Sequence, residues 1–218
     1  MKIFYILISY IFITNIFSNT TETPNNLEVI KNSPFLSYSA EFIFKEKDKK
    51  KAKIIREGLA TPRYYYDLYD ENSNHIARGV TRFFSLGLLN PYLMDIDVYN
   101  SNLYLGNISG KIIKRSRAKF MFYDENGINT AIAYLDAKKP DFIIVSAKNE
   151  TEIIAKLIGS VYGDVCVVNI EFVKNNSDLD PKLLKIFTAF VSDFYEKFLE
   201  PPKQIHHYHT TYNTTYRN

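Results

Sequence analysis

Repeated strand–turn–strand units constrain the fold of this chain more than any other feature of its sequence. Four times, a stretch of alternating apolar residues leads into a short polar turn and continues beyond it. These units are centred on residues 69–77, 99–103, 123–133 and 146–151. Because one hairpin buries only one face and needs neighbours to cover it, successive hairpins predict an all-β architecture.

The strands that flank these turns alternate with period two. In one of them, Ala118, Phe120 and Phe122 alternate with Lys119 and Met121. This pattern is typical of antiparallel strands with one buried face. Tyrosine (17 residues) and phenylalanine (16 residues) are abundant, and both favour such half-buried strands.

Three later segments are apolar without alternation, at residues 142–145, 153–158 and 164–173. Strands of this composition are covered on both faces, so the sheet must have something packed inside it. The candidate is a helix predicted over residues 181–199, which Asp180 can cap and Pro201–Pro202 ends.

The predicted helix is apolar on nearly every side, which is typical of a buried helix. A membrane-spanning helix is the alternative. Its uninterrupted apolar portion covers only residues 186–191, which is too short to cross a bilayer. We therefore expect a helix in the core.

The amino-terminal segment, residues 1–18, reads as a secretory signal peptide. Met1-Lys2 gives a positive start and residues 3–17 form a short apolar run. An uncleaved membrane anchor is the alternative. Residues 19–37 are rich in Asn, Thr, Pro and Ser and are expected to form a linker, so we predict a secreted or extracytoplasmic protein.

Cys166 is the only cysteine, which excludes a disulfide within the chain. It lies in the apolar run Val165-Cys166-Val167-Val168, where a cysteine behaves as a small hydrophobe. A catalytic cysteine needs a nearby histidine and an electropositive, accessible setting. We expect a structural thiol.

Several β-hairpins followed by one apolar helix at the carboxyl end resemble the tubby C-terminal-like superfamily. The superfamily includes the tubby proteins, the phospholipid scramblases and the LURP-one-related plant proteins. The resemblance spans residues 38–200 and rests on the four turns named above and the helix over residues 181–199. It implies a mainly β fold, in which antiparallel hairpins close into a barrel around the buried carboxyl-terminal helix.

The chain departs from these relatives in features that bear on function. It carries an export signal, whereas family members are mostly intracellular or membrane-associated. The proline-rich region, the cysteine cluster and the acidic calcium-binding segment of scramblases are missing. Lipid scrambling is therefore not expected.

The most basic segment of the predicted barrel is the candidate site for an anionic ligand. It contains Lys111, Lys114, Arg115, Arg117 and Lys119. On one strand, Arg115, Arg117 and Lys119 project from the same side, and arginine offers a bidentate fork to phosphate or carboxylate. The resemblance supports this segment, because tubby domains bind phosphoinositides through lysine and arginine on neighbouring strands. No binding residue of the family is matched individually.

The alternative for this basic segment is a solvated barrel face whose charge is balanced by Asp95, Asp97 and Asp124. A second lysine-rich run, residues 45–51, lies between two apolar strands and predicts a solvated hairpin tip.

Other chemistry-bearing residues favour structural interpretations. Asp70-Glu71 and Asp124-Glu125 lie in turns, where Asp forms local backbone hydrogen bonds. His75 is expected to be a solvated turn residue. The tract His206-His207-Tyr208-His209 has the density of a metal-binding segment. It belongs to residues 201–218, which we expect to form a flexible tail without a metal.

From the sequence we expect an exported, non-enzymatic barrel protein that binds an anionic phospholipid or a protein partner. We predict no cofactor, no nucleic acid partner and no integral membrane domain beyond the signal peptide. A structural envelope protein without a specific ligand is the first alternative. The second is an exported hydrolase with a site that the sequence hides.

Overall fold

The structure is a computed structural model that describes residues 26–32, 39–58, 63–82, 93–114, 117–135, 141–162, 165–173 and 178–198. These residues form strands and one helix. The elements are β1 (Leu27–Asn32), β2 (Ala40–Glu46), β3 (Lys49–Glu57), β4 (Tyr65–Asp70), β5 (His75–Thr81), β6 (Leu93–Asn100), β7 (Leu103–Lys114), β8 (Arg117–Asp124), β9 (Asn129–Leu135), β10 (Phe142–Ser146), β11 (Ile153–Tyr162), β12 (Val165–Phe172) and α2 (Pro181–Phe198).

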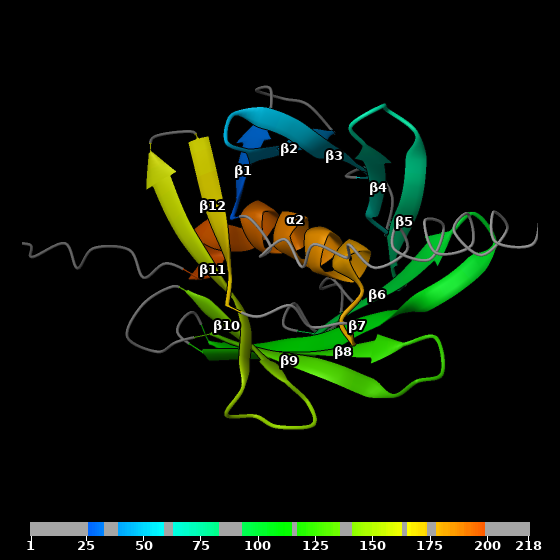
Figure 1. The fold of residues 1–218 in the computed structure, drawn as a ribbon, viewed down its shortest axis with the longest axis vertical. Coiled ribbons are helices and arrows are strands. Elements are labelled where there is room, and N and C mark those ends of the chain that lie inside the picture. Colours follow the sequence, from blue (N-terminus) through cyan, green and yellow to red (C-terminus); the bar gives the residue numbers. More distant parts are fainter. Residues whose placement is uncertain are drawn as a thin grey trace, which may run out of the picture.

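The strands form one closed antiparallel barrel (Figure 1). Each strand pairs with the next along the chain, and β1 closes the barrel by pairing with both β2 and β12. Closure leaves no row of unpaired backbone groups along an edge. The predicted fold class, a mainly β barrel of antiparallel hairpins, is confirmed.

The up-and-down order gives the barrel two different ends. At one, which we call the turn end, tight connections join β2 to β3, β4 to β5, β6 to β7 and β8 to β9. The opposite end, where β1, β3 and β7 finish, we call the far end. Since β12 runs toward the turn end, α2 begins there and runs back through the lumen.

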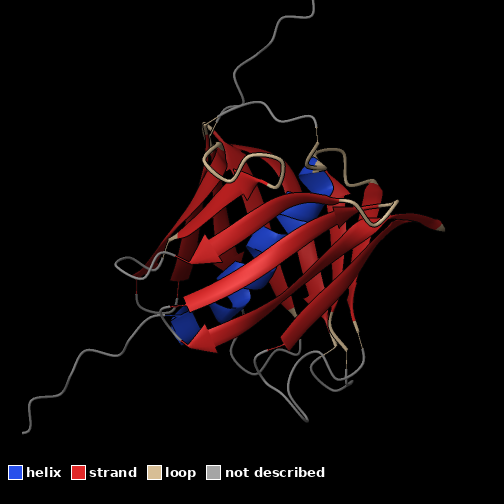
Figure 2. Cartoon of the chain, turned by 90° about the horizontal axis from the view of Figure 1, so that it is seen from below, coloured by secondary structure: helices blue, strands red, loops and turns tan. Residues whose placement is uncertain are grey.

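The predicted helix fills the barrel (Figure 2). Ile186, Phe187 and Phe190 are fully buried. The ring of Phe187 lies 5.2 Å from that of Phe120 on β8 and 5.6 Å from that of Phe142 on β10, both edge-on. Aromatic pairs in this geometry stabilise a core beyond the area they bury. A barrel closed around its last helix is therefore confirmed.

A glycine on β5 allows the helix to lie close to the barrel wall. A Cβ atom on Gly79 would lie 2.7 Å from Ile186 Cγ2, closer than two carbon atoms can approach. The side chain of Ile186 thus occupies the space that any other residue at position 79 would need.

Two expectations about the amino-terminal half have different outcomes. Residues 19–37 were expected to form a linker, but Leu27–Asn32 within them form β1, so the linker prediction is wrong there. The lysine-rich run does form a hairpin tip. Lys47 and Asp48 connect β2 to β3 with φ angles of 46° and 66°, the left-handed values that a tight two-residue turn requires.

The signal peptide (residues 1–18) and the tail (residues 201–218) lie outside the described residues. The side chain of Phe194 on α2 is likewise not described. In the described part of the chain, no helix combines the length and the hydropathy needed to cross a membrane.

Candidate functional site

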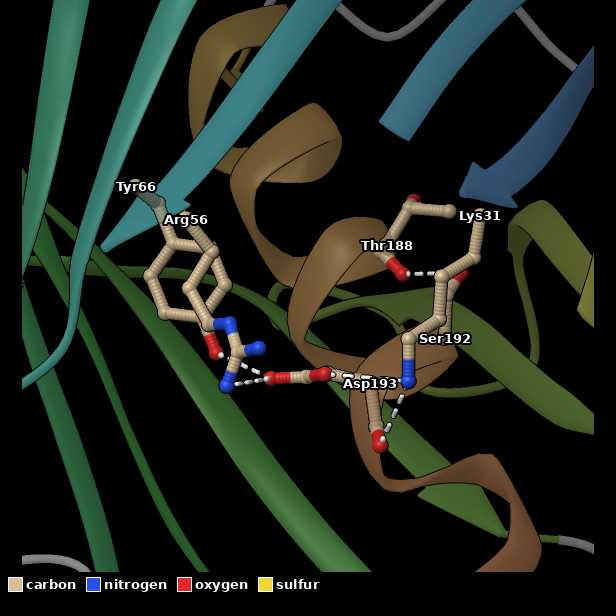
Figure 3. A network of polar contacts seen from close by, with 6 residues as sticks. All are labelled: Lys31, Arg56, Tyr66, Thr188, Ser192 and Asp193. Atoms are coloured by element: carbon tan, nitrogen blue, oxygen red, sulfur yellow. Dashed lines mark hydrogen bonds and ion pairs between the residues drawn. The ribbon is translucent and has the colours of Figure 1, made fainter. Parts of the chain in front are cut away.

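Charged side chains meet inside the barrel near the far end, around Asp193 on α2 (Figure 3). The side chain of Asp193 is only 6% exposed. Lys31 Nζ on β1 lies 3.1 Å from Asp193 Oδ1, and Arg56 Nη1 on β3 lies 3.3 Å from Asp193 Oδ2. Ions taken out of water must be paired to be tolerated, and here one carboxylate holds two cations. We call Lys31, Arg56, Tyr66 and Asp193 the lumenal charge cluster.

Tyr66 on β4 completes the cluster as a neutral donor. Its hydroxyl donates to Asp193 Oδ2 over 3.5 Å. Burial, with the negative charge of Asp193 adding to it, raises the pKa of Tyr66 well above its ordinary value, so the phenol stays protonated. Lys31 Nζ also donates to the backbone carbonyl of Asp193 over 3.4 Å.

The remaining polar groups on this part of α2 are satisfied within the helix. Thr188 Oγ1 donates to the carbonyl of Leu184 over 2.8 Å, and Ser192 Oγ donates to that of Thr188 over 2.8 Å. Hydroxyls bonded back to the preceding turn can lie in an apolar lumen without a further partner.

Arg56 is buried but incompletely paired. The residue is 5% exposed, and its guanidinium carbon lies 5.2 Å from the centre of the Tyr64 ring. Its Nε has no hydrogen-bond partner among the described residues. A buried N–H group without an acceptor costs folding free energy. Arg56 is therefore the least satisfied polar residue of the cluster.

The predicted basic segment is divided between two strands. Lys111 and Lys114 lie on β7, whereas Arg117 and Lys119 lie together on β8, as expected for these two residues. Arg115 lies outside the described residues.

The hairpin register nevertheless brings these cations together. Lys111 is the cross-strand partner of Lys119, and Lys114 is that of Arg117. Lys111 and Arg117 are exposed, Lys119 is half-buried, and the intervening Ala118 points into the core. Lys119 Nζ lies 5.2 Å from the centre of the Tyr134 ring, a cation–π contact with β9. Lys111 and Lys119 therefore share the outer face of the hairpin near the far end.

The acidic pairs in the turns act locally, as predicted. Asp70 Oδ1 accepts the backbone N–H of Asn72 and of Asn74, and Asp70 Oδ2 accepts the side-chain amide of Asn74. These hydrogen bonds, the side-chain one first, hold the pKa of Asp70 below its ordinary value. Asp124 accepts two backbone N–H groups in the same way. Turn chemistry accounts for both residues.

His75 is exposed, as expected, but it is not a turn residue. It is the first residue of β5, and its Nε2 lies 3.0 Å from Asp67 Oδ1 on the outer wall. Arg78 donates to both oxygens of the same carboxylate, through Nε over 2.6 Å and Nη2 over 2.9 Å. The hydrogen bond to Asp67 raises the pKa of Arg78. The partner of His75 is Asp67 on the neighbouring strand, so only the pairing of β4 with β5 reveals it.

A hollow of about 380 Å³ lies at the turn end beside the first turn of α2. Its acidic side chains already have partners. Asp178 pairs with Lys148 at 2.6 Å, and Asp180 accepts the backbone N–H of Lys182 over 2.7 Å. Asp124 belongs to the turn described above, and Glu125 accepts the side-chain amide of Asn126 over 3.5 Å. Since these carboxylates are occupied, the hollow gives no indication of a cation site.

The remaining sequence candidates offer no reactive centre in the described structure. Cys166 is buried on β12 in the apolar core, as expected for a structural thiol. Among the described residues, no cluster of His, Cys, Asp and Glu side chains could hold a metal ion. The tract from His206 to His209 lies outside them.

No protein-family model matches the chain, and no curated protein matches it.

The lumenal charge cluster was missed by sequence reasoning. Arg56 follows Ala52 and Ile54 at the inward positions of one strand, and this pattern was a usable signal. Lys31 fell in the expected linker.

Proposed function

We propose that this chain is an exported, non-enzymatic binding module of the tubby C-terminal-like kind. Its β7–β8 hairpin is proposed to contact the anionic headgroups of phospholipids. The support for the family is the order of the elements, strands first and a lumenal helix last. The support for the ligand is the basic patch, which we define as Lys111, Lys114, Arg115, Arg117 and Lys119.

The observation that carries this proposal is the pairing of like charges across the hairpin. Lys111 faces Lys119 and Lys114 faces Arg117 in the antiparallel register. Like charges directly opposite each other destabilise a sheet. A bound phosphate removes this repulsion and offers acceptors to the arginine and lysine donors. The patch is therefore better suited to binding an anion than to stabilising the barrel.

Two of the three acidic residues that could neutralise the patch are engaged elsewhere. Asp97 accepts two hydrogen bonds from Arg82, over 2.9 Å from Nε and 2.7 Å from Nη2. Asp124 accepts backbone N–H groups in the turn at the other end of β8. Asp95 faces Ser109 in the strand register. This arrangement favours an open basic patch over a balanced, solvated face.

Vesicle binding tests the proposal. The full chain is sedimented at low salt with phosphatidylcholine vesicles, with or without about one fifth phosphatidylserine. We expect binding that depends on the anionic lipid. The variant R115A/R117A/K119A should bind about 100-fold more weakly, since each cation near an anionic surface contributes about 1 kcal/mol.

A matched variant controls for net charge. K49A/K50A/K51A loses the same charge from β3 at the turn end, where these residues are exposed. It should bind with near wild-type affinity if the patch acts as a site. An equal loss of vesicle binding in both variants contradicts the proposal. Unchanged vesicle binding in a folded R115A/R117A/K119A protein also contradicts it.

A further inference from the structure

We propose that the lumenal charge cluster is a binding site for a small oxyanion, a single carboxylate or phosphate-type group held by the Nε edge of Arg56. This site is separate from the basic patch on the outer wall and does not depend on the proposed function.

The charges of the described cluster are unequal. Lys31 and Arg56 both contact the one carboxylate of Asp193, at 3.1 and 3.3 Å. Tyr66 adds a neutral hydroxyl donor and no negative charge, because its pKa is raised. Among these four residues, cations therefore exceed carboxylates and donors exceed acceptors. An added anion would correct both imbalances.

The edge of Arg56 that arginine uses for bidentate binding is not filled. Arg78 and Arg82 hold Asp67 and Asp97 through Nε together with Nη2, the two donors of one planar edge. Arg56 instead contacts Asp193 through Nη1, and its Nε lacks a partner among the described residues. The Nε–H that takes part in both forks on the outer wall thus lacks an acceptor among the described residues inside the barrel.

The burial of Arg56 and the donor groups of the cluster determine the class of ligand. Arg56 is 5% exposed, so only a small group can reach its open edge. Three groups of the cluster, Lys31, Arg56 and Tyr66, are donors, which exclude a cation and favour an oxyanion. In a water-poor lumen, a charge-assisted hydrogen bond of this kind is stronger than on the surface.

Thermal unfolding of the full chain at neutral pH and constant ionic strength tests the site. Chloride is replaced in separate titrations by inorganic phosphate, by acetate, or by short-chain phosphatidic acid. The last of these carries the phosphate group on a lipid. At about 100 times the dissociation constant, a ligand of the native state should raise Tm by about 5–10 °C. The titration that saturates first identifies the source of the oxyanion.

R56K is the decisive variant, because it keeps the positive charge and loses the fork. We expect it to lose the rise in Tm, whereas K111A/R117A/K119A should keep it. Failure of the outer patch to bind vesicles would leave this result unchanged. No saturable rise with any of the three anions, or an equal rise in R56K, overturns the proposal.

A second measurement applies to the wild-type protein alone, should R56K fail to fold. The Nε–H resonance of Arg56, followed by NMR during the phosphate and acetate titrations, should shift with the same saturation as Tm. An Nε–H resonance that does not respond to either anion contradicts the site.

Discussion

Asp193 connects α2 to three different strands. It pairs with Lys31 of β1 and Arg56 of β3, and it accepts a hydrogen bond from Tyr66 of β4. Because these contacts lie in the lumen, they are screened far less by solvent than ion pairs on the outer wall. Each partner of Asp193 therefore fixes the depth and rotation of the helix.

Removing this carboxylate should be costly. In D193A, Arg56 remains buried and Lys31 half-buried without an opposite charge, and we expect the free energy of unfolding to fall by about 3–5 kcal/mol. Urea unfolding measures the loss. The matched variant D97A frees Arg82, whose side chain is 52% exposed, and should cost under about 1 kcal/mol. A D193A protein no less stable than D97A would contradict the stabilising role.

Single residues show how far the sequence could predict this cluster. Period-two alternation places Arg56 on the inner face of β3, together with Ala52 and Ile54. That pattern predicts a buried charge without identifying its partner. The partner depends on how deep α2 lies in the lumen, which is a tertiary property with no local signal. His75 was misassigned for the same reason, because Asp67 reaches it only through the pairing of β4 with β5.

Among the elements, the turns and the helix were predicted well because their signals are local. Asp70 and Asp124 form hydrogen bonds within their own turns, so their role does not depend on the rest of the fold. Asp180 caps α2 in the same local way. β1 was missed because its six residues become a strand by pairing with β2 and with β12, and β12 lies near the other end of the sequence.

The fit of α2 against β5 gives a prediction at this scale. In G79A, the new Cβ would meet Ile186 Cγ2 at 2.7 Å, and we expect a loss of about 1–3 kcal/mol in the free energy of unfolding. In an I186A background, that contact is absent and the same change should cost clearly less. Additive effects in this double-mutant cycle would indicate that the helix does not press against Gly79.

For the whole molecule, the structure separates a stabilising interior from two positively charged features near the far end. The aromatic lumen around Phe187 holds the barrel and the helix together. The basic patch lies outside on β7 and β8, and the open edge of Arg56 lies inside on β3. Barrel closure also requires β1 and β12 to pair across most of the chain length, a non-local contact that slows folding.

Because α2 forms the core of the barrel, we expect the helix and the strands to unfold together. Native-state hydrogen exchange tests it most directly, because it measures the opening free energy of individual amides. We predict that the amides of residues 186–191 exchange only through global unfolding, with the same opening free energy as the most protected amides of β7 and β8. A lower opening free energy for residues 186–191, with the strands still protected, would show that the helix leaves an intact barrel and would contradict the claim.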